Sequence, residues 1–174
     1  VGSLCAQKAF ATKFILLVCD TLQTFPSFIY LIPVIMLFGV TDTSVLIAVI
    51  IYATIPAIRY TVEGLRNVPR SLQDAGTMSG VNRLQRLVEI ELPLAFPHIM
   101  LGINQTVVFA LFMVIIGAMI GTDDLGQYIL KALSDKNGTG NGLMLGRCVA
   151  FIGLTVDHLI LRWSAERKKA LGII

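Results

Sequence analysis

The chain has 174 residues, of which 55% are hydrophobic and 14% are charged, and its mean hydropathy is +0.78. Soluble domains carry about a quarter charged residues, so this composition excludes an ordinary soluble protein and predicts a multi-pass membrane protein. A net charge of +3 is too small to indicate a nucleic-acid partner.

The N-terminal part contains two uncharged runs, Thr24–Val40 and Ser44–Ile58, on either side of the short turn Thr41–Thr43. We predict an antiparallel pair of membrane helices here, although each run is shorter than the ~20 residues of a straight span. Prolines remove backbone donors in or beside these runs, so we expect kinked helices. These prolines are Pro26, Pro33 and Pro56.

Two further apolar runs, His98–Gly121 and Leu143–Trp163, bring the predicted spans to four. The last is the weakest, because it contains Arg147, Asp157 and His158, which are costly inside a bilayer. We expect these three side chains to lie near the ends of a short span and to reach the interface.

Two features of the run His98–Gly121 suggest close contact with other helices. Asn104 and Gln105 are expected to face protein or a water-filled path, because an amide that faces lipid lacks partners. Hydrogen bonding between helices and contact with a permeant molecule are both open for them. Gly117 and Gly121 form a GxxxG motif, which favours close helix crossing and the pairing of two copies.

Basic residues indicate the orientation of the chain. The segment 59–97 holds five arginines and the C-terminal segment 162–169 holds four basic residues, whereas the turn Thr41–Thr43 has none. Because Lys and Arg near the ends of spans favour the cytoplasmic side, we predict that the central segment and the C-terminus are cytoplasmic.

The central stretch 71–93 is polar where its neighbours are apolar. It contains two capping-box spacings, which predict two short helices with a glycine turn between them. The residues concerned are Ser71 with Asp74, Asn82 with Gln85, and Gly80 at the turn.

The first of these two helices is expected to expose unusually small residues. They are Ala75, Gly76, Thr77 and Ser79. A helix that only keeps a loop soluble would carry Glu, Lys and Gln, so small residues suggest that another protein surface approaches its backbone closely. An ordinary solvated loop is the alternative.

The second helix is expected to have an apolar stripe that lies against protein or membrane, opposite a charged face in water. The stripe consists of Leu84, Leu87, Val88 and Glu91, and the charged face of Arg83, Arg86 and Glu89. Pro93 is expected to end this helix.

The spacing of Asp74–Gly76, Gly80 and Ile90–Pro93 resembles the EAA signature of binding-protein-dependent ABC importer permeases, with Asp74 in place of the usual Glu and Gly76 in place of the second Ala. Four longer segments are similar to the glycine betaine, proline betaine and choline branch of that family. They are Asp20–Gly39, Pro56–Pro69, Leu92–Val107 and Gly121–Ile129.

The resemblance implies an all-α membrane protein with the type I ABC importer fold, kinked helices and a cytoplasmic coupling helix. Residues 1–174 would form one permease transmembrane domain, in which 59–97 is the coupling loop. Since the chain starts at Val1 with neither an initiator methionine nor a signal-peptide pattern, we expect an N-terminally truncated copy of a longer protein.

By the same resemblance, the coupling loop would seat in a separate ATPase subunit, which binds ATP and Mg²⁺. The permease itself would hold no cofactor and perform no catalysis. Its other partners would be a second, identical permease copy, a substrate-binding protein and membrane lipid, in a bacterial inner membrane. The ATPase-coupling residues would be Asp74, Ala75, Gly76, Gly80, Ile90, Leu92 and Pro93.

The branch implies an osmoprotectant substrate: glycine betaine, choline, proline betaine, carnitine or trimethylamine N-oxide. A quaternary ammonium is attracted to aromatic faces, although such rings also pack in any core. Candidate residues of the translocation path are Phe25, Phe28, Tyr30, Asn104 and Gln105.

Other functions are left open. A permease of the same family for an amino acid or another small solute is one, and a membrane scaffold or small channel without an ATP cycle is another. An intramembrane enzyme is disfavoured, because it needs a paired nucleophile and base or metal ligands at membrane depth, whereas His98 and His158 lie near the cytoplasmic ends of two spans without such partners. Cys5, Cys19 and Cys148 do not have the spacing of a metal site.

Overall fold

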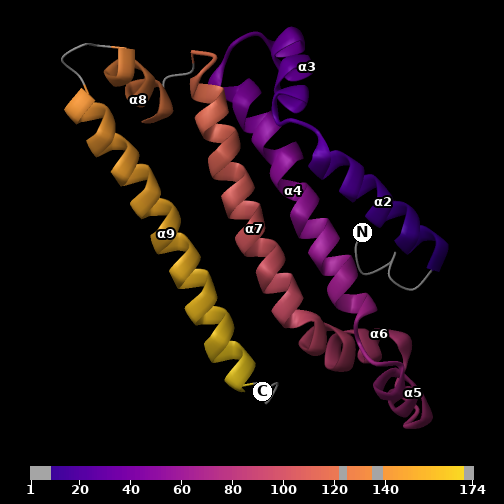
Figure 1. Cartoon of the computed structure of the whole chain (residues 1–174). Coiled ribbons are helices and arrows are strands. Elements are labelled where there is room, and N and C mark those ends of the chain that lie inside the picture. Colours follow the sequence, from indigo (N-terminus) through magenta and orange to yellow (C-terminus); the bar gives the residue numbers. More distant parts are fainter. Residues whose placement is uncertain (1–8, 122–124, 135–138, 171–174) are drawn as a thin grey trace.

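The computed structural model of the chain describes residues 9–121, 125–134 and 139–170, and all regular structure in them is helical (Figure 1). The prediction of an all-helical membrane protein is therefore confirmed. The elements are α2 (Ala9–Thr24), α3 (Phe28–Phe38), α4 (Asp42–Arg66), α5 (Arg70–Met78), α6 (Arg83–Gln85), the π-helix η1 (Arg86–Glu91), α7 (Leu92–Ala118), α8 (Leu125–Ser134) and α9 (Thr139–Ala170).

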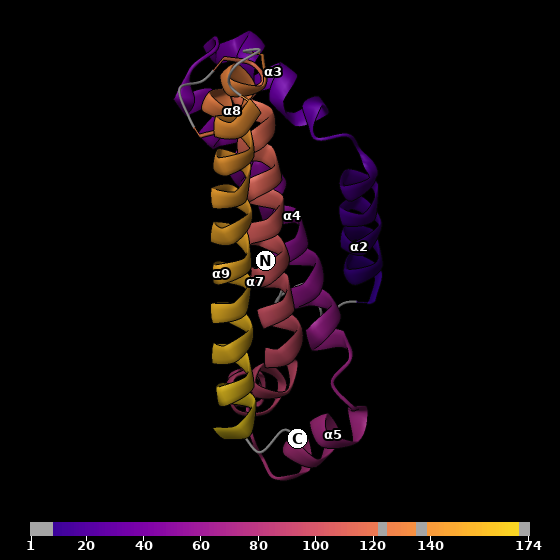
Figure 2. The ribbon, with the colours of Figure 1, turned by 60° about the vertical axis from the view of Figure 1, so that its left-hand side comes forward.

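Three long helices run side by side through the molecule: α4, α7 and α9 (Figures 1 and 2). In the described residues, the segments Asp42–Arg66, Arg83–Ala118 and Gly140–Lys169 are long and apolar enough to cross a membrane. A bent helix pair provides up to one more span. The short helix α8 lies between the ends of α7 and α9 at one end of the molecule (Figure 1).

The first predicted span, Thr24–Val40, contains a shorter helix, α3, which makes a candidate span only together with α2. The chain breaks between α2 and α3, whose axes differ by 83°. Pro26 lies in the break, and a proline disfavours helical backbone at the residue before it, here Phe25. The Tyr30 hydroxyl donates a hydrogen bond to the Leu22 carbonyl across the break, which satisfies an acceptor that the lost helical turn leaves free.

The antiparallel pair α4 and α7 forms the most extensive helix contact, and glycines make its close approach possible. An added Cβ would lie 2.7 Å from His98 Cβ at Gly64, 2.8 Å from Tyr60 Cβ at Gly102, and 2.6 Å from Val45 Cγ1 at Gly117. The helices would have to separate, or these side chains move, to admit larger residues.

The two glycines of the GxxxG motif lie in different surroundings, whereas we expected them to form one close-packing surface. Gly117 packs against Val45 of α4 in the same chain. Gly121 lies beyond the end of α7 with a φ of 111°, in the turn that follows the helix. The two glycines do not form one helical face that pairs with a second copy, because only the first of them is helical.

The packed core lies where α3, α4 and α7 meet. Leu31, Val34, Val45, Ala48 and Met113 are buried in it. A row of rings flanks this cluster, with centroids 5.3 Å apart between Tyr30 and Tyr52 and 5.0 Å apart between Tyr52 and Phe109. The aromatic residues thus link the three helices through packing.

Within the described residues, helix α9 packs mainly against α7 and α8, and its most apolar window has 0% of its residues buried. Its described links to α7 are few: Trp163 meets Phe96 at 6.1 Å between ring centroids, and Asn104 donates a hydrogen bond to Asp157. The helix is longer than the predicted span Leu143–Trp163, and it continues through the basic segment that begins at Arg162. The expectation that Asp157 reaches an interface stays a prediction.

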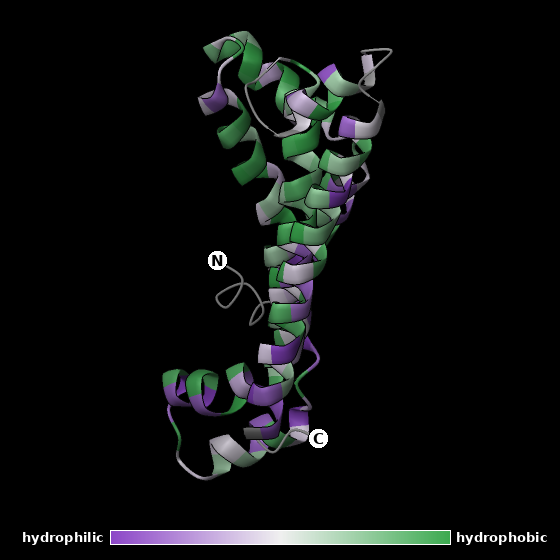
Figure 3. Cartoon of the chain, turned by 90° about the vertical axis from the view of Figure 1, so that its left-hand side faces the viewer, coloured by the Kyte–Doolittle hydropathy of each residue, from purple (hydrophilic) through white to green (hydrophobic). Residues whose placement is uncertain are grey.

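Polar residues gather at the end of the molecule formed by α5, α6 and the start of η1 (Figure 3). The last turn of α9 contains Arg167, Lys168 and Lys169 and lies toward the same end (Figures 1 and 2). Both basic segments are therefore on one side of the apolar helices. This arrangement agrees with the prediction that the central segment and the C-terminus lie on the same side of the membrane.

Candidate functional site

The polar connection between α4 and α7 is shorter than the predicted loop 59–97. Helix α4 continues to Arg66, and α7 begins at Leu92. Arg59 is part of α4, where its Nη1 donates a hydrogen bond of 2.7 Å to Gln23 Oε1 of α2. Its Nε lies 3.0 Å from Asp20 Oδ1, an ion pair without hydrogen-bond alignment.

The first helix of the connection, α5, begins directly after Pro69. The predicted capping box at Ser71 is wrong, because the helix starts before Ser71 and its N-cap, Pro69, has no side chain that accepts a hydrogen bond. A proline at this place is favourable, since it presets φ next to donors that are unpaired in any first turn. Gln73 Nε2 donates to the Val68 carbonyl at 3.2 Å and ties α5 to the buried Val68.

The turn after α5 is a Schellman motif. Gly80 has a φ of 78°, a left-handed conformation that favours glycine. Its N–H donates to the Thr77 carbonyl at 3.1 Å, and the Val81 N–H donates to the Gly76 carbonyl at 3.3 Å. The predicted glycine turn is confirmed, and this pair of bonds satisfies the last carbonyls of the helix.

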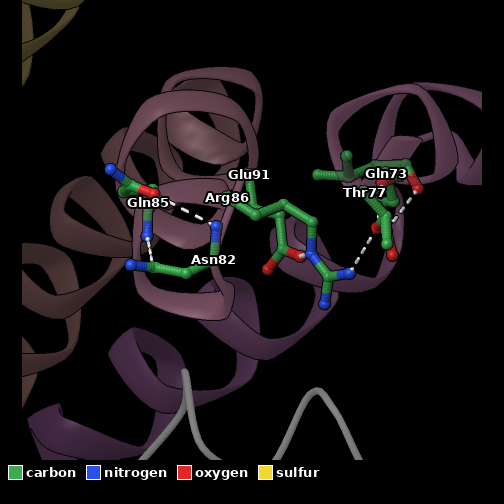
Figure 4. Close-up of polar contacts among 7 residues, drawn as sticks. Gln73, Thr77, Asn82, Gln85, Arg86 and Glu91 are labelled. Atoms are coloured by element: carbon green, nitrogen blue, oxygen red, sulfur yellow. Dashed lines mark hydrogen bonds and ion pairs between the residues drawn. The ribbon is translucent and has the colours of Figure 1, made fainter. Parts of the chain in front are cut away.

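The second predicted capping box is also confirmed. Asn82 Oδ1 accepts from the Gln85 N–H at 2.9 Å, and Gln85 Oε1 accepts from the Asn82 N–H at 3.1 Å (Figure 4). The box starts α6 immediately after the turn and fixes the direction in which the chain returns.

The chain then passes through the π-helix η1 into α7, so the prediction that Pro93 ends the second helix is wrong. Pro93 lies in the first turn of α7. In a continuous α-helix its ring would meet the carbonyl four residues earlier, but the wider turn of η1 comes just before it. The helix therefore carries the proline through and continues to Ala118.

Helix α5 lies against η1 at its smallest residue. Gly76 is the one buried residue of α5, and an added Cβ there would lie 2.5 Å from Ile90 Cδ1. The expectation that Gly76 is exposed is therefore wrong. Its missing side chain makes room within the chain, between α5 and η1, whereas Ala75, Thr77 and Ser79 are exposed as expected.

A charged network joins the same two elements (Figure 4). Arg86 Nε lies 3.0 Å from Glu91 Oε1, and Arg86 Nη1 donates to Thr77 Oγ1 at 3.1 Å. The Glu91 side chain is only 8% exposed, so its charge depends on this partner. Sequence reasoning assigned Arg86 to water, which is wrong. It assigned Glu91 to a face that lies against protein or membrane, and Glu91 is buried within the protein, where Arg86 meets its charge.

The π-helical geometry of η1 explains where the other residues of the predicted apolar stripe lie. Leu87 is half-buried, but Leu84 and Val88 are 72% and 53% exposed. A π-helix has more residues per turn than an α-helix, so an α-helical spacing does not keep these side chains on one face. Arg83 and Glu89 are exposed as expected.

The outer face of α5 is apolar although it lies at the polar end of the molecule. Leu72 is 43% exposed and Met78 is 89% exposed, and the exposed Ala75 lies between them at helical spacing. Asp74 is exposed beside this row. The sequence reasoning missed Leu72 and Met78, which the spacing i, i+3, i+6 around Ala75 signals.

The other predicted coupling residues lie on the inner side of the loop. Ile90 is half-buried and faces Gly76, and Leu92 packs against the buried cluster of Leu65, Val68 and Ala95. These side chains connect α5 to the start of α7. They support the exposed row from behind.

The predicted translocation residues do not form one group. Phe25 and Phe28 are each 41% exposed, near the break between α2 and α3. Tyr30 packs against Tyr52, and Asn104 faces α9. The prediction that Asn104 faces protein is confirmed, since it is 7% exposed, and Gln105 is half-buried. In the described residues, no three His, Cys, Asp or Glu side chains are close enough together to hold a metal ion.

Comparisons with known proteins agree with this architecture. Residues 1–166 match the family described as the binding-protein-dependent transport system inner membrane component. The chain is similar to the trimethylamine N-oxide transport system permease protein TmoV of Pelagibacter ubique, with 73% identity over 99% of this chain and 24% of that protein.

Two more distant relatives are glycine betaine permeases. The glycine betaine transport system permease protein OpuAB of Bacillus subtilis is 34% identical over 97% of this chain and 59% of its own length. The glycine betaine/proline betaine transport system permease protein ProW of Escherichia coli is 36% identical over 91% of this chain and 45% of its own length. The chain thus spans about a quarter of TmoV and about half of the other two.

Proposed function

This chain belongs to the family of binding-protein-dependent transport system inner membrane components, and we propose that it forms membrane-spanning helices of the permease in an ATP-driven importer of quaternary amines. The substrate class is trimethylamine N-oxide, glycine betaine and related osmoprotectants. This class is taken from the names of relatives that align with more than nine-tenths of this chain. Amino acids and other small solutes are the alternative substrates within the same family.

The observation that carries this proposal is the apolar row Leu72, Ala75 and Met78 on α5. Apolar side chains that are exposed away from the membrane favour a protein partner. We assign this row to the groove of an ATPase subunit, together with Asp74 beside it. Arg70 and Arg83 are exposed and available for ion pairs with that subunit.

The support behind the row suggests how force passes into the membrane. Helix α5 is held to η1 by Gly76 against Ile90 and by Arg86, which bonds both Thr77 and Glu91. Since η1 continues directly into α7, a displacement of α5 is passed to α7 without an intervening flexible loop. ATP-driven movement of the partner would in this way shift α7 between inward-facing and outward-facing arrangements.

The remaining parts of the importer lie in other subunits. ATP and Mg²⁺ bind to the ATPase, so the permease needs no cofactor and is not itself an enzyme. A substrate-binding protein delivers the solute, and a second permease copy covers the helix faces that this chain leaves open. We assign the type I importer fold, and a cytoplasmic location to α5 and the C-terminal end of α9, on which the basic residues gather.

The test uses the full-length permease, reconstituted in proteoliposomes with its ATPase and binding protein. Uptake of labelled trimethylamine N-oxide, glycine betaine and choline is measured together with ATP hydrolysis. Met78→Glu should leave the protein in the membrane but remove ATPase binding, whereas Met78→Leu should retain both. Leu84→Glu is the matched control, because Leu84 is also exposed but lies on α6.

Loss of uptake with Met78→Glu alone would support the docking face. Normal uptake with Met78→Glu would exclude it, and equal losses with Leu84→Glu would show that the docking surface is not confined to α5. If none of the three compounds is taken up by the unsubstituted protein, the substrate class is wrong.

A further inference from the structure

Asp157 is a carboxylate in the C-terminal half of α9. It lies about 20 Å from the C-terminal end of the helix, at a rise of about 1.5 Å per residue, and five residues before Arg162, where the basic segment begins. It is half-buried, and Asn104 Nδ2 of α7 donates a hydrogen bond of 2.6 Å to its Oδ1. Asn104 itself lies near the middle of α7, so the pair bridges two candidate membrane spans.

The charge of Asp157 is not neutralised within the part of the chain that the structure describes. The ion pairs found there are Arg59 with Asp20 and Arg86 with Glu91. His158 and Arg162 are exposed along a shallow hollow on α9 with Phe151 and Leu154. A carboxylate on a membrane span without a countercharge is costly, and such residues mark functional sites in membrane proteins.

A second observation points to a missing partner at the same place. Asn104 is 7% exposed, and its Oδ1 is buried without a hydrogen-bond partner, although its Nδ2 is bonded to Asp157. An unsatisfied buried acceptor is uncommon and is unfavourable unless something fills the site. The carbonyl oxygen and the carboxylate together make the pair strongly negative.

A purely structural bridge between α7 and α9 would not require a carboxylate. Two amides at these positions would bridge α7 and α9 equally well, and the energetic cost of a buried charge would be avoided. The carboxylate adds a negative charge, which attracts a cationic ligand. A quaternary ammonium has no N–H to donate, so this charge is the main attraction that the pair offers it.

We propose that Asp157, oriented by Asn104, is a specificity-determining residue that receives the trimethylated ammonium group of the substrate as it crosses the membrane. This inference rests on the proposed import of quaternary amines. Asn104 holds one carboxylate oxygen in place, and the other carboxylate oxygen is left to meet the cation. The aromatic residues near the break between α2 and α3 have no part in this site.

The experiment measures uptake and ATP hydrolysis in the same proteoliposomes, with full-length permease, its ATPase and saturating binding protein loaded with glycine betaine. Asp157→Asn keeps the size and hydrogen bonding of the side chain but removes its charge. We expect it to lower the uptake per ATP hydrolysed by at least about tenfold, since loss of even a screened charge interaction has this size. ATP hydrolysis stimulated by the loaded binding protein should remain.

Two further variants separate a role in specificity from a role in structure. Asp157→Glu restores the charge and should recover part of the uptake per ATP, whereas a purely structural defect would not be repaired by a longer side chain. Asn104→Leu removes the orienting hydrogen bond and should give a smaller loss of uptake per ATP than Asp157→Asn. The amount of each variant in the membrane is measured in parallel.

Unchanged uptake per ATP in Asp157→Asn, beside an active unsubstituted transporter, would overturn this inference but leave the proposed function intact. Equal losses of uptake and ATP hydrolysis in all three variants would also overturn it, because they would indicate a helix bridge only. If the unsubstituted transporter moves no quaternary amine, both the proposed function and this inference fail.

Discussion

Two regions of this chain, the joint between α5 and η1 and the long helix α9, are built in opposite ways. The joint between α5 and η1 is closed by many specific contacts: a Schellman turn, a capping box, a glycine under Ile90 and the network of Arg86. Helix α9 has one described hydrogen bond to α7 and one aromatic contact, and its apolar window has no buried residue. Contacts within the chain fix the shape of the joint, whereas few such contacts fix the position of α9.

This difference agrees with the roles proposed for the two regions. A joint that transmits force must keep its shape before the partner arrives, so its polar groups are satisfied internally and only its outer row is free. In the proposed importer, α9 would exchange neighbours during the transport cycle, and few fixed contacts make this possible. The predictions below test this contrast.

The largest effect is expected from Arg86→Ala, which leaves the buried Glu91 carboxylate without its partner. Loss of one member of such a pair destabilises a protein by about 3–5 kcal/mol, so we expect a lower Tm and loss of coupled transport. Thermal unfolding in detergent measures the first, and uptake per ATP the second. Arg83→Ala is the control for the Tm measurement alone, since Arg83 is exposed in α6. Equal Tm values for the two variants would contradict the rigid joint.

An intermediate effect is expected from Gly80→Ala. The φ of 78° at Gly80 costs an L-residue about 1–2 kcal/mol, although the space around it is open. We expect α5 to tilt and ATPase coupling to fall, with the membrane helices unchanged by circular dichroism. Gly80→Asn should be milder, because asparagine tolerates this conformation better. A variant with full coupling and an unchanged Tm would mean that the turn geometry is not required.

The smallest effect is expected in α9, from Trp163→Ala. It removes the edge-to-face contact with Phe96, which contributes about 0.5–1.5 kcal/mol. Trp163→Phe should retain most of this contact. Thermal unfolding of the isolated permease measures both variants. A destabilisation as large as that of Arg86→Ala would show that α9 is fixed as firmly as the joint, and the contrast between the two regions would be lost.

Part of this structure follows from local sequence signals. The glycine turn at Gly80 and the capping box of Asn82 with Gln85 depend on residues a few positions apart, and both are predicted correctly. The all-helical membrane architecture follows from the long apolar runs. These features require no knowledge of which helices meet in space.

The errors come from contacts between segments distant in the chain or from unusual helical geometry. The space at Gly76 is occupied by Ile90, and the charge of Glu91 is met by Arg86, which only the fold brings together. The π-helix changes the phase that sequence periodicity assumes and lets Pro93 continue the helix. The pairing of Asn104 with Asp157 links residues on different spans, so no local pattern predicts it.

The π-helix η1 also constrains how this segment evolves. Each residue of an α-helix turns the chain by about 100°, so gaining or losing one residue between Arg86 and Glu91 would rotate α5 about the axis of α7 by roughly that angle. The apolar row would then point away from its docking groove even if every side chain were retained. We therefore expect related permeases to vary in the composition of this segment far more readily than in its length.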